Sequence, residues 1–189
     1  MKCRICYRFS FLHICKKCQK LFLKPTLLET NALDLKIFSL YQYSDIEDLI
    51  KSKYHIYGSY IFKILAKNSI APFFKKLNFD KKIYAIAIDD NPKNYYSHSA
   101  ILLNQIKNRG IKPLYGVLRA KNDIQYAGKS KDFRLKNPRN FIYSGKSDIE
   151  VVLIDDVVTY GITLLEAKRV LEKSGVRVKF ALTLAKTMD

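Results

Sequence analysis

The chain has 189 residues, and its 34 Lys and Arg outnumber its 17 Asp and Glu to give a formal net charge of +17. A hydrophobic content of 48% with 7 Gly and 5 Pro is typical of one globular domain with a small appended module, and it excludes collagen-like and wholly disordered chains. The longest apolar runs, 83–88 and 151–154, are far shorter than the roughly 20 residues of a membrane-spanning helix. Basic residues interrupt any secretory signal at the start, so we expect a cytoplasmic protein without a membrane span.

The excess of positive charge is larger than solubility requires and indicates a polyanionic partner. An AT-rich coding sequence, which supplies Lys, Ile, Tyr and Asn, is the competing explanation. The charges are segregated: residues 51–82 carry eight Lys against one acid, and residues 107–146 carry eleven basic side chains against two acids. We therefore expect a basic nucleic-acid-binding surface around a separate acidic pocket.

All four cysteines lie in the first 18 residues, as the two C-x-x-C pairs Cys3, Cys6 and Cys15, Cys18. Each pair can point two thiolates at one ion, and two pairs complete the tetrahedral shell of structural zinc. His13 could replace one cysteine, and two disulfides are the alternative, which a cytosolic location disfavours. We expect residues 1–20 to form a zinc-binding module in which the metal stabilises the fold and does no chemistry.

Residues 21–31 contain Pro25 and no clear period, which predicts a linker before a main domain over 32–189. The predicted elements of the first half of that domain follow from hydrophobic periodicity and capping residues. They are a strand over 35–43, a helical turn over 46–50, helix over 59–77, a buried strand over 83–88, and a helix that begins at Ser97 or Ser99 and ends at Gly110.

The second half continues the alternation with strands over 114–118, 149–154 and 176–184 and a helix over 164–173. Residues 119–139 show no sustained period, and a loop of this length in a compact domain is usually functional or disordered. Strands that alternate with helices predict an α/β fold with a parallel sheet and right-handed crossovers.

The most informative segment is 151–163, which reads VVLIDDVVTYGIT. A buried strand delivers Asp155 and Asp156 to the carboxyl edge of the sheet, where open α/β folds bind ligands. Backbone N–H groups of the following turn, the hydroxyls of Thr159 and Thr163, and the positive end of the next helix suit a phosphate. The alternative is a strand end followed by an ordinary capped helix.

This segment resembles the phosphoribosyl pyrophosphate signature of type I phosphoribosyltransferases, an apolar strand, two acids and V-x-T-x-G-x-T. The resemblance implies a type I phosphoribosyltransferase-like parallel sheet flanked by helices, in which Asp155 and Asp156 bind the ribose hydroxyls. It also implies Mg²⁺ held by the ligand and water. The residues implied to cradle the 5′-phosphate are Val157, Val158, Thr159, Tyr160, Gly161, Ile162 and Thr163.

The whole chain, an N-terminal four-cysteine module before this domain, is similar to the ComF family of DNA-uptake competence proteins. Further positions that match the family are Arg119, Gln125, Arg134, Asn137 and Phe141. One motif departs: residues 95–99 read YYSHS where many relatives have R-G-[FY]-N-Q. Asp89 and Asp90 occupy the place of the pyrophosphate loop, where two carboxylates repel a diphosphate unless Mg²⁺ intervenes.

The resemblance implies a protein of natural transformation that binds single-stranded DNA and phosphoribosyl pyrophosphate, with DNA-uptake helicase or recombination proteins as partners. The chain has 13 Tyr among its many Lys, and aromatic rings on which bases stack, beside cations for the phosphates, suit the binding of single-stranded DNA. The expected DNA contacts are Arg119, Lys121, Lys129, Lys131, Arg134, Lys136 and Arg139. The alternative is an active Mg²⁺-dependent phosphoribosyltransferase acting on a nucleobase or related nucleophile, with 119–139 as its closing loop and catalytic residues that the sequence does not identify. A regulator that senses the same ligand would need a helix-turn-helix, which we do not recognise.

Overall fold

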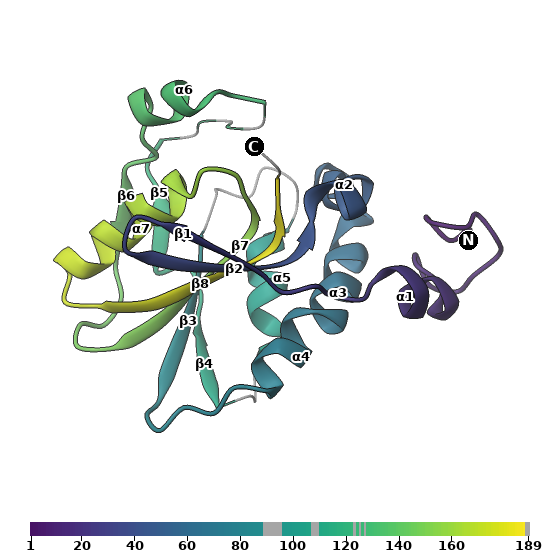
Figure 1. The fold of residues 1–189 in the computed structure, drawn as a ribbon, viewed down its shortest axis with the longest axis horizontal. Coiled ribbons are helices and arrows are strands. Elements are labelled where there is room, and N and C mark those ends of the chain that lie inside the picture. The colour runs from purple at the N-terminus through teal and green to yellow at the C-terminus, as the bar shows by residue number, and fades with distance from the viewer. Residues whose placement is uncertain (89–95, 107–109, 123, 125, 127, 188–189) are drawn as a thin grey trace.

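The structure is a computed structural model that describes residues 1–88, 96–106, 110–122, 124, 126 and 128–187 (Figure 1). Its centre is a six-stranded sheet in the order β1-β2-β8-β7-β3-β4. The strands are β1 (Leu28–Ala32), β2 (Leu35–Gln42), β3 (Ile83–Ala87), β4 (Ile111–Leu114), β7 (Glu150–Val158) and β8 (Arg177–Lys186). Neighbouring strands pair in parallel except β1 and β2, which are antiparallel. The expected α/β class with a parallel sheet is confirmed.

Helices cover both faces of the sheet, as Figure 1 shows. One face packs against the helices α2 (Tyr43–Lys51), α3 (Gly58–Asn68), α4 (Ile70–Lys75) and α5 (His98–Asn104), with the 3₁₀ turn η1 (Ser52–Tyr54) between α2 and α3. The other face packs against α7 (Ile162–Lys173) and against a two-stranded hairpin of β5 (Leu118–Ala120) and β6 (Phe141–Tyr143). Within the described ranges, no helix is long and apolar enough to cross a membrane.

Burial on both faces explains why the central strand has no alternating pattern. The four apolar residues from Val151 to Ile154 in β7 are fully buried, and they contact both hydrophobic clusters of the domain. A strand covered on both sides needs apolar side chains at every position, so its sequence is a continuous apolar run. The run ends where the strand emerges at Asp155.

The adjacent strands β3 and β7 send the chain to opposite faces of the sheet. The chain reaches α5 after β3 and α7 after β7, and these two helices belong to different hydrophobic clusters. Such a divergence is the topological switch point at which open α/β sheets bind ligands, at the carboxyl ends of the strands. Asp155 and Asp156 lie at this edge, whereas Asp89 and Asp90 fall outside the described residues.

Three segments differ from the sequence-based expectations. β1 begins within 21–31, the segment expected to be a linker, and adds an antiparallel edge to the sheet. The strand expected over 114–118 is wrong, because Gly116 adopts φ +65° and separates β4 from β5. Residues 119–139 are not one irregular loop, since they contain the last two residues of β5 and the helix α6 (Lys131–Lys136). We call residues 118–143 the hairpin arm.

Candidate functional site

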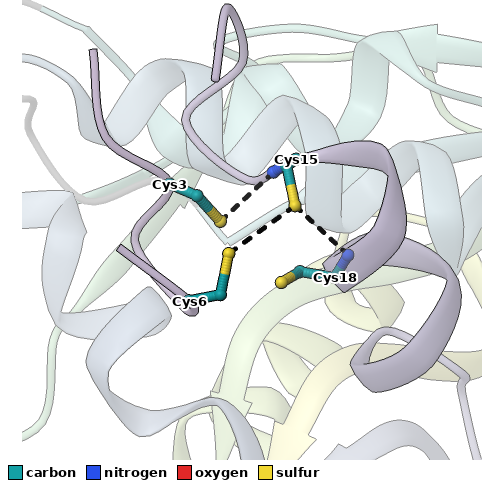
Figure 2. A group of neighbouring side chains, drawn as sticks. All are labelled: Cys3, Cys6, Cys15 and Cys18. Carbon is teal, nitrogen blue, oxygen red and sulfur yellow. Dashed lines mark hydrogen bonds between the residues drawn. The ribbon is translucent and has the colours of Figure 1, made fainter. Parts of the chain in front are cut away.

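The four cysteines form one cluster with their sulfur atoms turned toward one another (Figure 2). All four Sγ atoms lie within 4.8 Å of one another, and none of the cysteines forms a disulfide. The Sγ atoms of Cys6 and Cys15 are 3.9 Å apart. Tetrahedral zinc with Zn–S bonds of about 2.3 Å spaces its sulfurs by roughly 3.8 Å. The cluster therefore has the size and ligand chemistry to bind a zinc ion.

The backbone of the module supports thiolates at this cluster. The N–H of Cys15 donates to Cys3 Sγ at 3.3 Å, and the N–H of Cys18 donates to Cys15 Sγ at 3.4 Å, where Cys15 caps the helix α1 (Lys16–Phe22). Burial opposes a Cys3 thiolate, but backbone hydrogen bonds, first from Cys15, outweigh it and lower the Cys3 pKa to about 6. Burial raises the pKa of Cys18 to about 12, with the neighbouring thiols adding to the shift. The backbone thus favours the thiolate, the form that binds a metal, at Cys3.

His13 lies outside the four-thiol cluster and joins the module to the main domain. Its ring stacks on Tyr57 and Tyr60, with centroid distances of 5.9 and 5.1 Å. The guanidinium of Arg4 lies 4.0 Å from the centroid of the Tyr57 ring. Buried residues of the module belong to the same hydrophobic cluster as α3. The module is therefore packed against the main domain and is not joined to it by the chain alone.

The turn after β7 leaves an open helix N-terminus at the carboxyl edge. Gly161 adopts φ +71° as the N-cap of α7, and no side chain caps that end of the helix. The first turn of α7 carries no acidic residue, so the positive end of the helix dipole is not neutralised there. The first N–H groups of a helix have no intrahelical acceptor. This end of α7 can therefore accept an anionic group.

Glycine is required at position 161 for steric as well as conformational reasons. A Cβ atom at this position would lie 2.7 Å from the Cβ of Ala32. The close approach packs the turn against β1, the antiparallel edge strand that the sequence does not predict. Gly161 is therefore a position of close approach between the turn and β1.

The two acids at the end of β7 are not equivalent. Asp156 is 7% exposed and follows Val152 and Ile154 on the face that α3 and α5 cover. Asp155 is half-exposed, and its carboxylate lies near enough to Asp156 and to Lys53 to influence the pKa of each. The carboxylates of Asp155 and Asp156 accept hydrogen bonds from the next backbone N–H, both at 2.8 Å. The pair is held rigidly, but the two carboxylates have different surroundings.

Two residues that the sequence analysis did not assign to the site contact Asp156. Lys53 in η1 donates from Nζ to Asp156 Oδ2 at 2.8 Å, and His98 Nε2 at the start of α5 lies 3.7 Å from the same oxygen. Burial opposes the charged form of Asp156, but Lys53 and then His98 hold its pKa well below the usual range. Burial likewise opposes the Lys53 ammonium, and Asp156 outweighs it to raise the Lys53 pKa. Lys53 is thus the ion-pair partner of Asp156 at the end of β7 and not part of an open basic surface.

Tyr96 forms hydrogen bonds to the backbone of the segment that carries Lys53. Its hydroxyl donates to the backbone carbonyls of Lys53 at 3.2 Å and His55 at 3.3 Å. Gly58 allows this approach, because a Cβ there would lie 2.3 Å from the Tyr96 hydroxyl oxygen. Local sequence carries no signal for these contacts, since the residues come from separate elements. The tertiary fold alone brings them to the end of β7.

The hairpin arm reaches the turn through an arginine. The Arg134 guanidinium carbon lies 5.7 Å from the centroid of the Tyr160 ring and 5.5 Å from that of Tyr126. Arg134 also donates to the backbone carbonyls of Tyr126 at 3.0 Å and Lys129 at 3.2 Å. Arg134 therefore places a cation beside the predicted phosphate loop and orders the arm at the same time.

The other predicted DNA contacts differ in exposure. Arg119, Lys121, Lys129, Lys131 and Lys136 are exposed on the hairpin arm. Arg139 is half-buried over the Tyr126 ring, with its guanidinium carbon 4.5 Å from the centroid, and its backbone N–H donates to Glu166 of α7. Gln125 lies outside the described residues. The arm thus presents five exposed cations and two that also organise its structure.

Comparison with known proteins finds no family model and no curated protein that matches the chain. Among solved structures, UMP synthase of Leishmania donovani is 19% identical with a TM-score of 0.38, over 67% of this chain and 22% of that one. A hypoxanthine phosphoribosyltransferase of Staphylococcus aureus is 14% identical with a TM-score of 0.42, over 66% and 62% of the two chains. Orotate phosphoribosyltransferase of Mycobacterium tuberculosis H37Rv is 11% identical with a TM-score of 0.41, over 90% and 82%. At TM-scores below 0.5 these similarities transfer no residue role and no activity to this chain.

Proposed function

We propose that the chain binds phosphoribosyl pyrophosphate at the carboxyl edge of β7 and handles single-stranded DNA during natural transformation, as a protein of the ComF type. The observation that carries the ligand assignment is the uncapped N-terminus of α7 next to two acids at a topological switch point. A 5′-phosphate satisfies the free N–H groups of the helix, and a carboxylate accepts hydrogen bonds from a ribose diol.

The charges around the site suit a ligand with several phosphates. Lys53 and Arg134 bring cations to the two sides of the turn, and Asp155 supplies a carboxylate for the ribose. Asp156, already paired with Lys53, orients that lysine. Mg²⁺, when bound with the ligand, neutralises the diphosphate, and the carboxylates of this edge have the oxygen donors that it prefers.

The DNA assignment rests on the exposed cations of the hairpin arm together with the excess of positive charge. Exposed lysines that contact DNA phosphates displace the counterions condensed on the DNA. This gain does not depend on the bases, so it supports binding without sequence preference. The four-cysteine module, which packs on α3, adds further Lys and Arg of its own. Helicase or recombination proteins of DNA uptake are the proposed protein partners, and the cytoplasm is the proposed location.

An active phosphoribosyltransferase is the second candidate, favoured by the contact between Arg134 of the hairpin arm and Tyr160 of the turn. An arm that closes over a bound sugar phosphate excludes water from the transfer of the ribosyl group. Pyrophosphate release from phosphoribosyl pyrophosphate and Mg²⁺, measured with a panel of nucleobases, separates the two candidates. A binding protein releases none above the protein-free rate, whereas a transferase releases it with one acceptor.

The binding proposal is tested by fluorescence anisotropy of a labelled oligothymidine, with and without phosphoribosyl pyrophosphate. We expect saturable oligothymidine binding that weakens steeply with salt. Absence of binding at low salt would remove the DNA-handling part of the proposal. The ligand part is tested separately by calorimetry.

A further inference from the structure

The three most exposed aromatic side chains within the described part of the chain all lie on the four-cysteine module. Tyr7, Phe9 and Phe11 are 72%, 74% and 84% exposed, and the rings of Phe9 and Phe11 meet edge to face at 5.4 Å. Monomeric proteins rarely leave adjacent large apolar groups in water without a binding role. We call these three rings the knuckle platform.

Hydrogen bonds hold the knuckle platform in its exposed position. Ser10 Oγ donates to the carbonyl of Leu12 at 2.8 Å and accepts from the Leu12 N–H at 3.0 Å, which fixes the turn between Phe9 and Phe11. The N–H of Ser10 donates to the carbonyl of Met1 at 2.9 Å. The rings are therefore presented by a braced turn, which reduces the ordering cost of binding.

Tyr7 occupies a backbone conformation that favours glycine. Its φ is +58°, and its N–H donates to the carbonyl of Cys3 in the tight turn of the first C-x-x-C pair. A bulky side chain at positive φ is strained, whereas glycine adopts this conformation without a steric cost. A tyrosine therefore stands where glycine would be less strained. This indicates that the Tyr7 ring has a role other than stabilising the fold.

The charge of the module identifies the occupant. The first acidic residue of the chain is Glu29, while seven Lys and Arg precede it. Lys2 pairs with Phe9 in a β-bridge, and Arg8 separates Tyr7 from Phe9, so exposed cations flank the platform directly. Exposed rings beside cations match the chemistry of single-stranded nucleic acid, in which bases stack on aromatic faces and phosphates pair with cations.

We infer that the knuckle platform is a base-stacking site for single-stranded nucleic acid. This inference rests on the proposed DNA-binding function and places a stacking contact on the zinc module, separate from the cations of the hairpin arm. The rings supply affinity that salt does not screen, and Lys2 and Arg8 supply the salt-dependent part.

The test uses the 189-residue chain loaded with zinc and a fluorescein-labelled oligothymidine. The variant Tyr7→Gly, Phe9→Ser, Phe11→Ser removes the platform, and Leu33→Ser with Ile56→Ser removes two side chains of equal exposure elsewhere. We expect the platform variant to bind more than about tenfold more weakly at every salt concentration with an unchanged salt slope. The control variant should bind like the wild type. Lys2→Ser with Arg8→Ser should flatten the slope by about 0.7 for each lost contact.

Zinc content and thermal unfolding, measured on each variant, show that the module is intact, and Tyr7→Gly tested alone gives a variant with less backbone strain. Affinity within about twofold of wild type in the zinc-loaded platform variant would overturn the inference while the DNA-handling proposal stands. Absence of oligothymidine binding by the wild type overturns both. If the variant keeps oligothymidine binding and loses sedimentation with vesicles of phosphatidylcholine and phosphatidylserine, the platform is a membrane contact and the inference is wrong.

Discussion

Lys53 Nζ and Asp156 Oδ2 lie 2.8 Å apart although 103 residues separate them in the chain. The contact joins η1, on one face of the sheet, to the end of the strand that carries the two acids. It makes Asp156 the buried, ion-paired acid, whereas Asp155 next to it is half-exposed. The ligand site is therefore built asymmetrically around one paired carboxylate.

The substitution Lys53→Met tests this ion pair. It leaves Asp156 buried without its cation, and breaking such a pair by removing one partner costs about 3–5 kcal/mol of unfolding free energy. Urea denaturation near neutral pH measures the loss. The matched control is Lys51→Met, because Lys51 pairs with Glu47 at 2.8 Å on the exposed surface, where solvent screens the pair and its loss should barely change stability.

The pH dependence of the same variant follows from the two pKa shifts. The Asp156 pKa is lowered, so its contribution to stability is complete above the unfolded value of about 4 and is lost as pH falls through the folded value. The Lys53 pKa is raised, so its contribution is complete below about pH 10 and is lost as pH rises further. The stability gap between wild type and Lys53→Met should be widest between these limits and should narrow in acid. A gap that does not change below about pH 4 would contradict the ion-pair account.

The four-cysteine cluster should hold one zinc ion per chain. Metal analysis of Cys15→Ser is expected to show its loss together with a lowered unfolding temperature, because the module cannot build a core of its own. His13→Ala is the control, since this ring stacks on Tyr57 and Tyr60 outside the cluster and should not affect zinc content. Full zinc occupancy in Cys15→Ser would refute the four-thiolate site.

Substitution of the two acids should separate ligand binding from stability. Asp155→Asn is expected to weaken phosphoribosyl pyrophosphate binding by about tenfold or more, the effect of losing charged hydrogen bonds to the ribose, while the unfolding temperature stays near that of wild type. Asp156→Asn should also lower the unfolding temperature, because a neutral amide no longer balances the charge of the Lys53 ammonium. Equal stability of the two variants, measured by calorimetric scanning, would mean that the acids are equivalent after all.

The exposed cations of the hairpin arm should govern the salt dependence of DNA binding. Replacing Lys129, Lys131 and Lys136 by Ser is expected to flatten the plot of log affinity against log salt by about 0.7 per lost contact. The fold should remain intact, because all three side chains are exposed. Arg134 is left in place, since it also organises the arm. A control that removes equal charge at Lys24, Lys173 and Lys179 should leave the slope closer to wild type, and equal slopes in the two variants would exclude the arm from the DNA site.

Elements with a strong local pattern could be predicted from the sequence, and contacts between distant segments could not. The apolar runs before Asp89 and Asp155 identify β3 and β7, and Gly161 with the following periodicity identifies α7. The two C-x-x-C pairs are close in sequence and fold into one cluster. β1 is an edge strand in which only Leu28 and Ala32 are apolar, so its sequence is typical of a linker although its burial alternates.

The pairing of Lys53 with Asp156 is a tertiary contact of the kind that no local pattern reveals. Lys53 stands in a Lys-rich stretch, where charge alone indicates a solvated surface. Only the packing of η1 against the carboxyl edge, with Tyr96 and Gly58 in close contact, turns this one lysine inward. The nonequivalence of the two acids follows from the same packing.

Calorimetric titration of the wild type with phosphoribosyl pyrophosphate in Mg²⁺ tests the central claim most directly. We predict saturable binding at one site per chain, weakened by about tenfold or more in Thr159→Val and again in Thr163→Val, because each loses a hydroxyl expected to contact a charged phosphate. Thr26→Val, an exposed position outside the turn, should bind like the wild type. No saturable heat with the wild type, or affinity unchanged in both turn variants, would contradict the assignment of the turn after β7 as the ligand site.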